Sequence, residues 1–293
     1  MKDVLLIVNP KAGKTQSKSA LYDIISPLCS HGIDPVVHIT SSQNDATNYI
    51  TEHGENFDTV ICVGGDGTLN ETIAGVMTLE KPIPIGYIPA GSTNDLASSL
   101  GLPKDIPSAV KAIINGEPKY FDIGRMNGRY FSYIACFGAF TKTSYSTPQN
   151  LKNSLGHFAY VLEGIKSLGE IKPYHAKITV DGTEIEGDYL YCAVSNSTSV
   201  AGMIKLDKNL VDFTDGIFEI MLVKSPKDIL EFNKIITSLT LNKFDTDMVS
   251  FFHGKDFTFT VDQKIGWTVD GEYAGSFKTA DIRCLHNTIQ IIR

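Results

Sequence analysis

Three short segments of the sequence combine glycines with polar side chains in the manner of loops that hold phosphate groups. The most specific, residues 64–71, reads Gly-Gly-Asp-Gly-Thr-Leu-Asn-Glu and directly follows an apolar run at 59–63. Its glycines leave no side-chain bulk beside the end of that run, so phosphate oxygens can reach the amides of the loop and of a following helix. The carboxylate of Asp66 would repel a bare anion, and it therefore indicates a bound Mg²⁺ or an acceptor hydroxyl.

The other two segments are residues 9–14, after the apolar run 4–8, and residues 89–95, after the apolar run 83–88. Both would place backbone N–H groups at the start of a helix, where an anion is stabilised. The first of them is not a Walker A loop, and taken alone it could be an ordinary surface turn. A simpler role is also open to the hydroxyl groups of these motifs, which could cap the helices that follow: Thr68, Ser92 and Thr93.

Acidic residues further along the chain also have two interpretations, a catalytic or metal-binding role and an ordinary turn. Asp270-Gly271-Glu272 could be catalytic, although Asp-Gly is also a strong signal for a hairpin turn. Asp212 and Asp215 lie three residues apart, and such a pair can hold a hard cation with backbone carbonyls completing its shell. An acidic surface turn would have the same spacing, so both interpretations stay open.

Composition excludes several other classes of protein. The formal net charge of -7 offers no basic footprint for nucleic acid, and it disfavours an anionic membrane surface unless one face is locally basic. The seven histidines lack zinc-site spacing, and no Gly-x-Ser-x-Gly elbow or Gly-x-Gly-x-x-Gly fingerprint accompanies the glycine-rich loops. Five scattered cysteines and the lack of any apolar stretch near ~20 residues predict a cytoplasmic protein.

The elements that would position these loops form two domains. Over residues 1–120, short apolar runs alternate with amphipathic stretches, which predicts a doubly wound, Rossmann-like parallel sheet with helices on both faces. Ligands of such sheets bind beyond the carboxyl ends of the strands, where all three loops would lie. Residues 121–293 show mainly strand alternation with an Asp181-Gly182 hairpin signal, which predicts an antiparallel β-sandwich. The C-terminal residues are a candidate addition to the first domain.

Taken in order, these motifs resemble the diacylglycerol kinase catalytic domain family, and most of all its soluble bacterial lipid kinases. The similarity rests on Asn-Pro-x-Ala-Gly at residue 9, Gly-Gly-Asp-Gly-Thr-Leu-Asn-Glu at 64, Ala-Gly-Ser-Thr-Asn-Asp-Leu-Ala at 90 and Val-Asp-Gly-Glu at 269. It extends through residues 121–124, 130–131, 144–148 and 158–160. Gly-Gly-Asp-Gly-Thr alone is shared with NAD kinases and sphingosine kinases.

The resemblance implies a kinase that moves the γ-phosphoryl of ATP to a lipid hydroxyl, with ATP in a cleft between the two domains. It implies that Glu272 accepts the proton of that hydroxyl, with Asp270, Asp66 and Asp95 around it. It implies a structural Mg²⁺ at Asp215 with the carbonyls of Asp212 and Ile217. The implied ATP contacts are Asn9, Pro10, Lys11, Ala12, Gly13, Lys14, Thr40, Gly65, Asp66, Gly67, Thr68, Leu69, Asn70, Glu71, Ser92 and Thr93.

The most direct reading of the resemblance is conversion of diacylglycerol to phosphatidic acid by a homodimer that contacts the membrane peripherally and transiently. The stretch 199–207 departs from the family, because its glycine cluster is thinned and Asp207 stands about where proline is expected. That departure leaves the acceptor and the conformation of the metal loop open. Two alternatives are an NAD kinase and a non-catalytic nucleotide-binding module, although four acids at 66, 95, 270 and 272 would serve no purpose in a mere binder.

Overall fold

A computed structural model describes residues 3–13, 21–138, 173–200, 204–205, 211–241, 243–244 and 246–293. The chain divides into two compact units. Unit 1 comprises Met1–Ile123 with His286–Arg293, and unit 2 comprises Gly124–Leu285. None of the helices in the described ranges has the length and hydropathy that a membrane span requires.

Unit 1 is built on a parallel sheet. Its first four strands are β1 (Val4–Val8), β2 (Val36–Ile39), β3 (Thr59–Gly64) and β4 (Ile85–Pro89). They lie in the order β2-β1-β3-β4, and all the pairs are parallel. β1, β3 and β4 are buried along their whole length, which explains why each reads as a continuous apolar run in the sequence.

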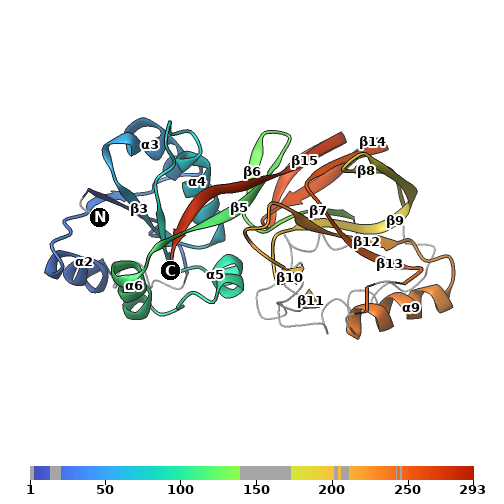
Figure 1. Cartoon of the computed structure of the whole chain (residues 1–293), viewed down its shortest axis with the longest axis horizontal. Coiled ribbons are helices and arrows are strands. Elements are labelled where there is room, and N and C mark those ends of the chain that lie inside the picture. The colour runs from blue at the N-terminus through green and yellow to red at the C-terminus, as the bar shows by residue number, and fades with distance from the viewer. Residues whose placement is uncertain are drawn as a thin grey trace. The chain divides into compact units, whose positions relative to one another are not determined.

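Helices cover both faces of this sheet, as the alternating pattern predicts (Figure 1). They are α2 (Leu21–Ser30), α3 (Asp45–His53), the short 3₁₀ helix η1 (Gly54–Asn56), α4 (Asp66–Val76), α5 (Asp95–Leu100) and α6 (Ile106–Asn115). α3 packs beside α4, and α2 packs beside α6. The apolar side chains of α2 and α6 join β1, β3 and β4 in one buried cluster. The doubly wound fold is confirmed, and it places the loops after β1, β3 and β4 at one edge of the sheet.

The last strand of the chain completes this sheet. β15 (Glu272–Ile292) starts in unit 2 and ends in unit 1, where Ile291 pairs in parallel with Ile85 of β4. The backbones of Glu117 and Arg293 exchange two hydrogen bonds of 3.2 and 3.1 Å. The end of the chain is therefore part of the α/β unit.

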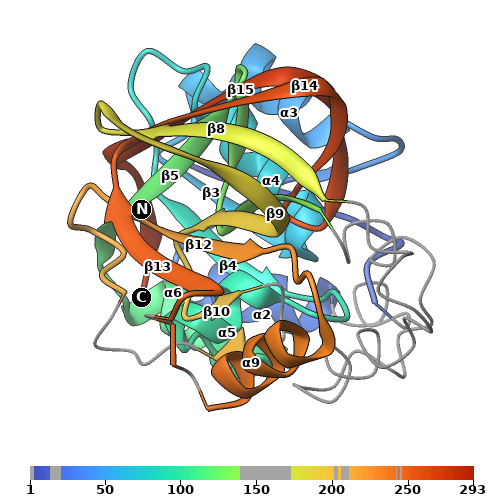
Figure 2. The same cartoon turned by 90° about the vertical axis from the view of Figure 1, so that its right-hand side faces the viewer.

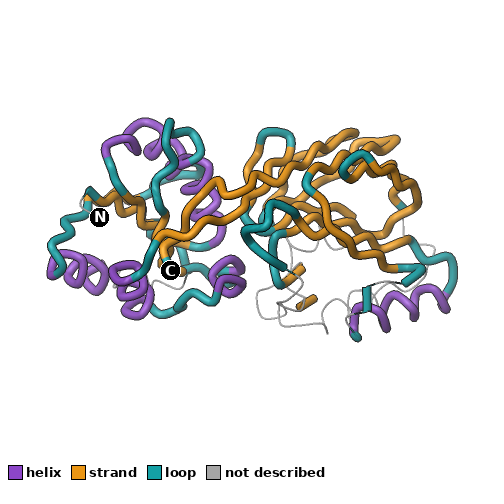
Figure 3. The backbone as a smooth tube through the Cα atoms, in the orientation of Figure 1, coloured by secondary structure: helices purple, strands orange, loops and turns teal. Residues whose placement is uncertain are grey.

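Unit 2 consists mainly of antiparallel strands, in contrast to the helix-rich unit 1 (Figure 3). Besides β15 they are β5 (Pro118–Met126), β6 (Arg129–Phe131), β7 (Ile134–Gly138), β8 (Tyr174–Val180), β9 (Thr183–Ser195), β10 (Ser199–Val200), β11 (Ile204–Lys205), β12 (Phe218–Lys224), β13 (Val249–Gly254) and β14 (Asp256–Val269). β5 begins in unit 1, as its residue numbers show. The predicted hairpin at Asp181-Gly182 is confirmed, because both residues have positive φ, 48° and 86°, between β8 and β9.

The central strands of unit 2 bury both faces. In β7, Ala135 and Phe137 join a cluster with Trp267, whereas Ile134 and Cys136 join a second cluster on the other face. The second cluster includes α9 (Ile229–Thr240), which lies along one side of the strands in both views (Figure 2). Two buried faces require cover on both sides, and the antiparallel β fold predicted for this part of the chain is confirmed.

Two details of the predicted elements differ from the structure. The two strands expected at 256–261 and 267–269 are one continuous strand, β14, with a register shift between Thr260 and Ile265. The helix α9 was not predicted. The predicted start of the first helix, at residues 14–20, lies outside the described residues, as does the helix expected from residue 151.

Candidate functional site

The three predicted loops of unit 1 meet at the carboxyl edge of the sheet, and Asn9 ties the first of them to the second. Its backbone N–H donates to the carbonyl of Val63 at 3.0 Å, and its side-chain Nδ2 donates to Oγ1 of Thr68 at 2.8 Å. Its Oδ1 accepts a hydrogen bond from the backbone N–H of Lys11 at 2.9 Å. Asn9 therefore shapes its own loop and holds it against the first turn of α4.

Glycine backbones join the second loop to the third. A Cβ added to Gly91 would lie 2.5 Å from Cα of Gly65, and one added to Gly13 would lie 2.1 Å from the carbonyl oxygen of Ala90. The N–H of Ala90 also donates to the carbonyl of Gly64 at 2.8 Å. Only residues without side chains allow these three segments to approach so closely.

Asn94 fixes the shape of the third loop. It has a left-handed backbone conformation, with φ of 51° and ψ of 57°. Its Oδ1 accepts hydrogen bonds from the N–H of Gly91 at 3.0 Å and the hydroxyl of Tyr87 at 3.2 Å, and its Nδ2 donates to the carbonyl of Gly91 at 2.8 Å. This role was not predicted, although Asn is the residue type most often found in this conformation after glycine.

The first turn of α4 differs from its prediction in one respect. The helix begins at Asp66 with Gly65 as its N-cap, rather than near Leu69. Thr68 therefore lies inside the helix and does not cap it. Glycine at the N-cap offers no side-chain acceptor, so the N–H groups of the first turn remain directed outward, as anion binding requires.

The other two candidate capping residues, Ser92 and Thr93, do not cap a helix either. α5 begins at Asp95 and its N-cap is Asn94, whose side chain makes no capping hydrogen bond. Ser92 and Thr93 precede it, and both side chains are exposed. Lys11 is also exposed on the first loop, whereas Lys14 lies outside the described residues.

Several carboxylates surround this loop cluster and give it negative charge. Burial raises the pKa of Tyr87 well above its usual value, and nearby Asp66 and Asp95 raise it further. Burial likewise raises the pKa of Cys62 to about 12, with a smaller contribution from Glu71 and Asp66. Asp66 and Asp95 are thus two carboxylates near Tyr87 and beside a helix N-terminus. Such a pair suits a cation that would accompany a polyphosphate.

Thr40 lies at the end of β2, where its N–H donates to the carbonyl of Val8 at 2.9 Å. A few residues further on, the N–H of Asn44 donates to Oε1 of Glu71 at 2.8 Å. Glu71 is thus an anchor that joins the loop after β2 to α4, in addition to its place in the glycine-rich motif.

In unit 2, Asp270 and Gly271 form the tight turn between β14 and β15, with φ of 47° and 81°. The Asp270 side chain is buried and is fully used within this turn region. Its Oδ2 accepts hydrogen bonds from the N–H and Oγ of Ser132 at 2.7 and 3.0 Å. Its Oδ1 accepts from the N–H groups of Tyr133 and Ile134 at 3.0 and 3.1 Å. The carboxylate therefore clamps the β6–β7 connection to the turn.

Glu272, the first residue of β15, is half exposed and pairs with Arg129. The guanidinium Nη2 donates to Oε2 of Glu272 at 2.9 Å, and Nη1 donates to the carbonyl of Tyr273 at 3.2 Å. The two contacts hold one carboxylate oxygen in a defined position and leave the other available to solvent. No motif in the sequence identified Arg129.

The predicted metal loop contains two consecutive side-chain turns. Oδ1 of Asp212 accepts from the N–H and Oγ1 of Thr214 at 2.9 and 2.8 Å, and Oδ1 of Asp215 accepts from the N–H of Ile217 at 3.0 Å. Among the described residues, no cluster of three or more His, Cys, Asp or Glu side chains could hold a metal ion. A cation here would need carbonyl and water ligands as well.

Glu219, just beyond this loop on β12, was missed by the sequence reasoning. It is 1% exposed, and its Oε2 has no hydrogen-bond partner within the described part of the chain. Burial raises its pKa to about 8, and the charge of Asp215 contributes to the rise. A buried carboxylate with an unsatisfied oxygen beside Asp215 is a place where a cation would be stabilising.

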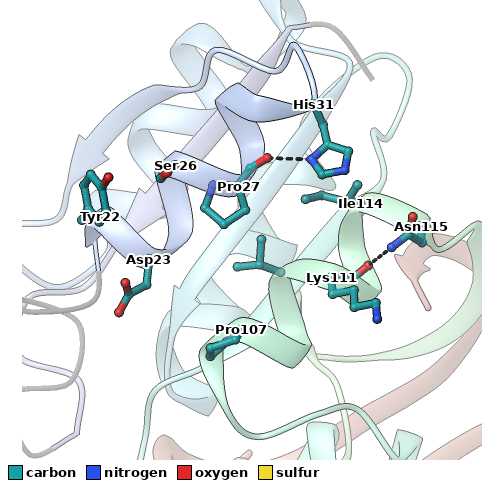
Figure 4. Close-up of a pocket in the computed structure, with 10 residues that line it drawn as sticks. Tyr22, Asp23, Ser26, Pro27, His31, Pro107, Lys111, Ile114 and Asn115 are labelled. Atoms are coloured by element: carbon teal, nitrogen blue, oxygen red, sulfur yellow. Dashed lines mark hydrogen bonds between the residues drawn. The ribbon is translucent and has the colours of Figure 1, made fainter.

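Two cavities are lined by none of these residues. A groove of 460 Å³ separates α2 from α6 and is lined by Tyr22, Asp23, Ser26, Pro27, His31, Pro107, Val110, Lys111, Ile114 and Asn115 (Figure 4). A second, of 510 Å³, lies in unit 2 among Arg125, Asn127, Gly128, Asp256, Phe257, Thr258, Asp281, Ile282 and Arg283. Neither cavity is lined by a predicted site residue. The candidate site is therefore defined by the loops and not by these two cavities.

Comparison with known proteins supports this arrangement. Residues 3–126 match the family model of the diacylglycerol kinase catalytic domain, and residues 142–293 match that of the YegS C-terminal NAD kinase beta sandwich-like domain. Diacylglycerol kinases of Bacillus subtilis (strain 168) and Staphylococcus saprophyticus are each 34% identical to this chain. The alignments cover 94% of this chain and 91% and 90% of those proteins.

Solved structures agree with the sequence comparison. A crystal structure of a diacylglycerol kinase from Bacillus anthracis str. Sterne is 27% identical, has a TM-score of 0.77 and covers 99% of this chain and 96% of its own. An α/β unit that matches the diacylglycerol kinase catalytic domain, together with relatives that are diacylglycerol kinases, makes this chain a lipid kinase. The chain belongs to the diacylglycerol kinase catalytic domain family, which confirms the resemblance inferred from the motifs.

Replacing Gly91 by alanine tests the loop contact. The added Cβ would meet Cα of Gly65 at 2.5 Å and Oδ1 of Asn94 at 2.8 Å, so one of the loops must shift. We expect the free energy of unfolding to fall by about 1–3 kcal/mol, as measured by urea denaturation. Gly187→Ala is the control, because its Cβ would make only ordinary contacts of 3.4 Å or more. Equal stability of the two variants would contradict the close packing of the loops.

Asp270→Asn tests the clamp in unit 2. One of the two carboxylate oxygens becomes an NH₂ group that faces existing donors, so at least one hydrogen bond is lost and buried N–H groups are left unsatisfied. The expected loss of stability is about 2–3 kcal/mol. The exposed Asp247→Asn serves as the control in the same denaturation experiment. A loss below ~0.5 kcal/mol for Asp270→Asn would show that the clamp contributes little.

Proposed function

We propose that this lipid kinase transfers the γ-phosphoryl group of ATP to the free hydroxyl of diacylglycerol and so forms phosphatidic acid. The observation that carries the proposal is the cluster of glycine-bearing loops at the carboxyl edge of the sheet in unit 1, with the N-terminus of α4 open beside it. The names of the relatives, diacylglycerol kinases over most of their length, support the choice of acceptor.

In this proposal, unit 1 holds the nucleotide. The phosphates contact the amides of Gly65, Gly67 and the first turn of α4, together with the hydroxyls of Ser92 and Thr93. The loop that begins at Asn9 contributes through residues 9–14 as the resemblance implies, and its contacts with Thr68 and Ala90 place Asn9 and Gly13 in the same loop cluster. Thr40 lies where the loop after β2 begins. Asn9 and Asn94 do not need to touch ATP, since their hydrogen bonds already hold the loops in place.

Glu272 is the proposed general base. Its carboxylate accepts the proton of the acceptor hydroxyl while the hydroxyl oxygen forms a bond to the γ-phosphorus and the bond to the β-phosphate oxygen breaks, releasing ADP. Arg129 is a positioning residue, because it holds one oxygen of Glu272. Asp270 is also assigned a positioning role, since its carboxylate accepts hydrogen bonds from residues 132–134 and so holds the turn that carries Glu272.

Two sets of acids are proposed to accompany Mg²⁺. Asp66 and Asp95 supply negative charge beside the phosphate loops, and Asp215 with the carbonyls of Asp212 and Ile217 forms a structural site. When bound, Mg²⁺ neutralises phosphate charge or fixes the loop that it occupies. The buried, unsatisfied oxygen of Glu219 supports the second location, because a nearby cation would offset the cost of that buried carboxylate.

Glu272→Gln tests the chemistry. Glutamine keeps the shape of the side chain but cannot accept the proton, so kcat should fall by about 10²–10⁴-fold while ATP affinity changes little. The measurement is transfer of label from γ-labelled ATP to diacylglycerol in detergent micelles, with NAD as a second acceptor.

Glu186→Gln is the matched control, because Glu186 is another exposed glutamate on a strand of unit 2 and pairs with His175. Turnover of Glu272→Gln at the wild-type rate would remove Glu272 from the mechanism. Phosphorylation of NAD without any lipid product would establish the NAD kinase alternative, and ATP binding without transfer would establish the non-catalytic one.

Asp215→Asn tests the structural cation. Mg²⁺ that binds the folded chain should raise its stability over that in EDTA by about 2.7 kcal/mol at 100 times Kd, and the variant should lose this gain. The experiment is thermal unfolding with Mg²⁺ or EDTA, with Asp247→Asn as the control. If Mg²⁺ stabilises Asp215→Asn as much as the wild type, the site lies elsewhere.

A further inference from the structure

The loop after β2 contains a serine whose hydroxyl proton is already used. Oγ of Ser41 donates to Oδ2 of Asp45 at 2.8 Å, and the backbone N–H of Ser41 donates to the same oxygen at 2.6 Å. The bond from the backbone, and then the bond from the side chain, hold the pKa of Asp45 below its usual value. Asp45 is therefore a carboxylate at neutral pH, and a carboxylate can only accept hydrogen bonds.

This arrangement makes the hydroxyl oxygen of Ser41 an acceptor. A serine hydroxyl has one proton and two lone pairs, and here the proton is directed to Asp45. Ser41 is exposed, so the lone pairs of its oxygen are accessible to a ligand. A ligand group that meets this oxygen must be a hydrogen-bond donor, such as a hydroxyl or an amino group. An ionised phosphate oxygen only accepts hydrogen bonds and does not fit.

The other oxygen of Asp45 is held as well. Nε2 of His38 lies 3.0 Å from Oδ1 of Asp45. The ring of His38 stacks on the ring of Tyr49, with centroids 3.8 Å apart and an angle of 20° between the planes. His38 belongs to β2 and Tyr49 belongs to α3, so the carboxylate is fixed between a strand and a helix. The position of the Ser41 oxygen therefore depends on a carboxylate that is bonded through both of its oxygens.

The loop after β2 begins beside the first of the phosphate-type loops. The N–H of Thr40 donates to the carbonyl of Val8 at 2.9 Å, so Ser41 follows a residue that is bonded to the end of β1, where the loop of Asn9 starts. In the order β2-β1-β3-β4 the direction of the connections reverses between β1 and β3, and nucleotides bind over such a point. In dinucleotide-binding sheets, an acidic side chain that follows the first glycine-rich turn by one strand accepts a hydrogen bond from the ribose.

We propose that the hydroxyl oxygen of Ser41 accepts a hydrogen bond from a ribose hydroxyl of the nucleotide, and that Asp45 is the positioning residue that fixes this acceptor. The proposal rests on the proposed function, because it requires a nucleotide in unit 1. It makes Ser41 a specificity-determining residue, since a ribonucleotide satisfies its oxygen and a deoxynucleotide does not. Water can replace the missing hydroxyl at an exposed residue, so the preference for the ribonucleotide is about 3–10-fold, the value of one neutral hydrogen bond.

Nucleotide binding to the whole chain tests the proposal. The affinities for ATP, 2′-deoxy-ATP and 3′-deoxy-ATP are measured by isothermal titration calorimetry with Mg²⁺ and without lipid, for the wild type, Ser41→Ala and Asp45→Ala. The matched controls are Ser108→Ala and Asp105→Ala. Asp105 caps α6 by accepting from the N–H of Ser108 at 3.0 Å, and bonds from the backbone and side chain of Ser108 lower its pKa in the same way. Neither control residue is a predicted site residue.

We expect the wild type to bind ATP about 3–10-fold more tightly than at least one deoxy analogue, which identifies the hydroxyl that Ser41 contacts. Ser41→Ala keeps the backbone bond to Asp45 and should bind ATP as weakly as that analogue. Asp45→Ala should also lose the preference, although Ser41 is present. The controls should keep the wild-type ratio within about twofold. A purely structural role of Asp45 would lower the stability of its variant and leave this ratio unchanged.

Three results would overturn the proposal. They are equal binding of ATP and both deoxy analogues by the wild type, a preference for ATP that survives in Ser41→Ala, and a Ser41-dependent preference for ATP over inosine triphosphate alone, which would assign the contact to the base. Transfer of label to diacylglycerol is measured separately. Normal transfer without a ribose preference would overturn this proposal alone. A Ser41-dependent ribose preference without transfer to any lipid would overturn the proposed function and leave the contact in place.

Discussion

The close approach of the Gly65 and Gly91 backbones is the constraint on which the proposed nucleotide site depends. It requires that the loops after β3 and β4 have no side chains where they touch, and it brings Asp66 and Asp95 near the same tyrosine, Tyr87. Parallel strands end at a common edge in any doubly wound sheet, but a common edge alone leaves loops free to diverge. The glycines and the side chain of Asn94 convert that edge into one surface of backbone N–H groups and acids.

In unit 2 the corresponding constraint comes from a buried carboxylate, that of Asp270, and not from a close contact between glycines. Asp270 uses both of its oxygens to hold the backbone of residues 132–134, and the positive φ of Asp270 and Gly271 makes the turn tight. Because Asp270 is saturated and buried, it has no lone pair left for a substrate proton. The adjacent Glu272 is half exposed and is held by one ion pair, so it retains an oxygen for chemistry. Two acids two residues apart thus have different environments, and this difference is the basis of the different roles proposed for them.

Features that depend on neighbouring residues could be predicted from the sequence, whereas contacts between residues far apart in the chain could not. The strand at 4–8 and the hairpin at Asp181-Gly182 follow from apolar runs and turn residues, and both were predicted closely. Arg129 contacts Glu272 across 143 positions, and no local pattern encodes that pairing. The start of α4 was misplaced because Thr68 suggested a cap, whereas the extended Gly65 ends the loop earlier.

The omission of α9 has a different cause, because its signals are local. Asp228 and Glu231 have the spacing of a capping box, and Phe232, Ile235 and Leu239 recur at helical intervals. Ile229, Leu230 and Leu241 add apolar residues that break this periodicity, so the segment looks less amphipathic than its buried side is. The residues that obscured the helix are the ones left outside the core, so the apolar pattern of the whole segment does not follow the single face that packs against the strands.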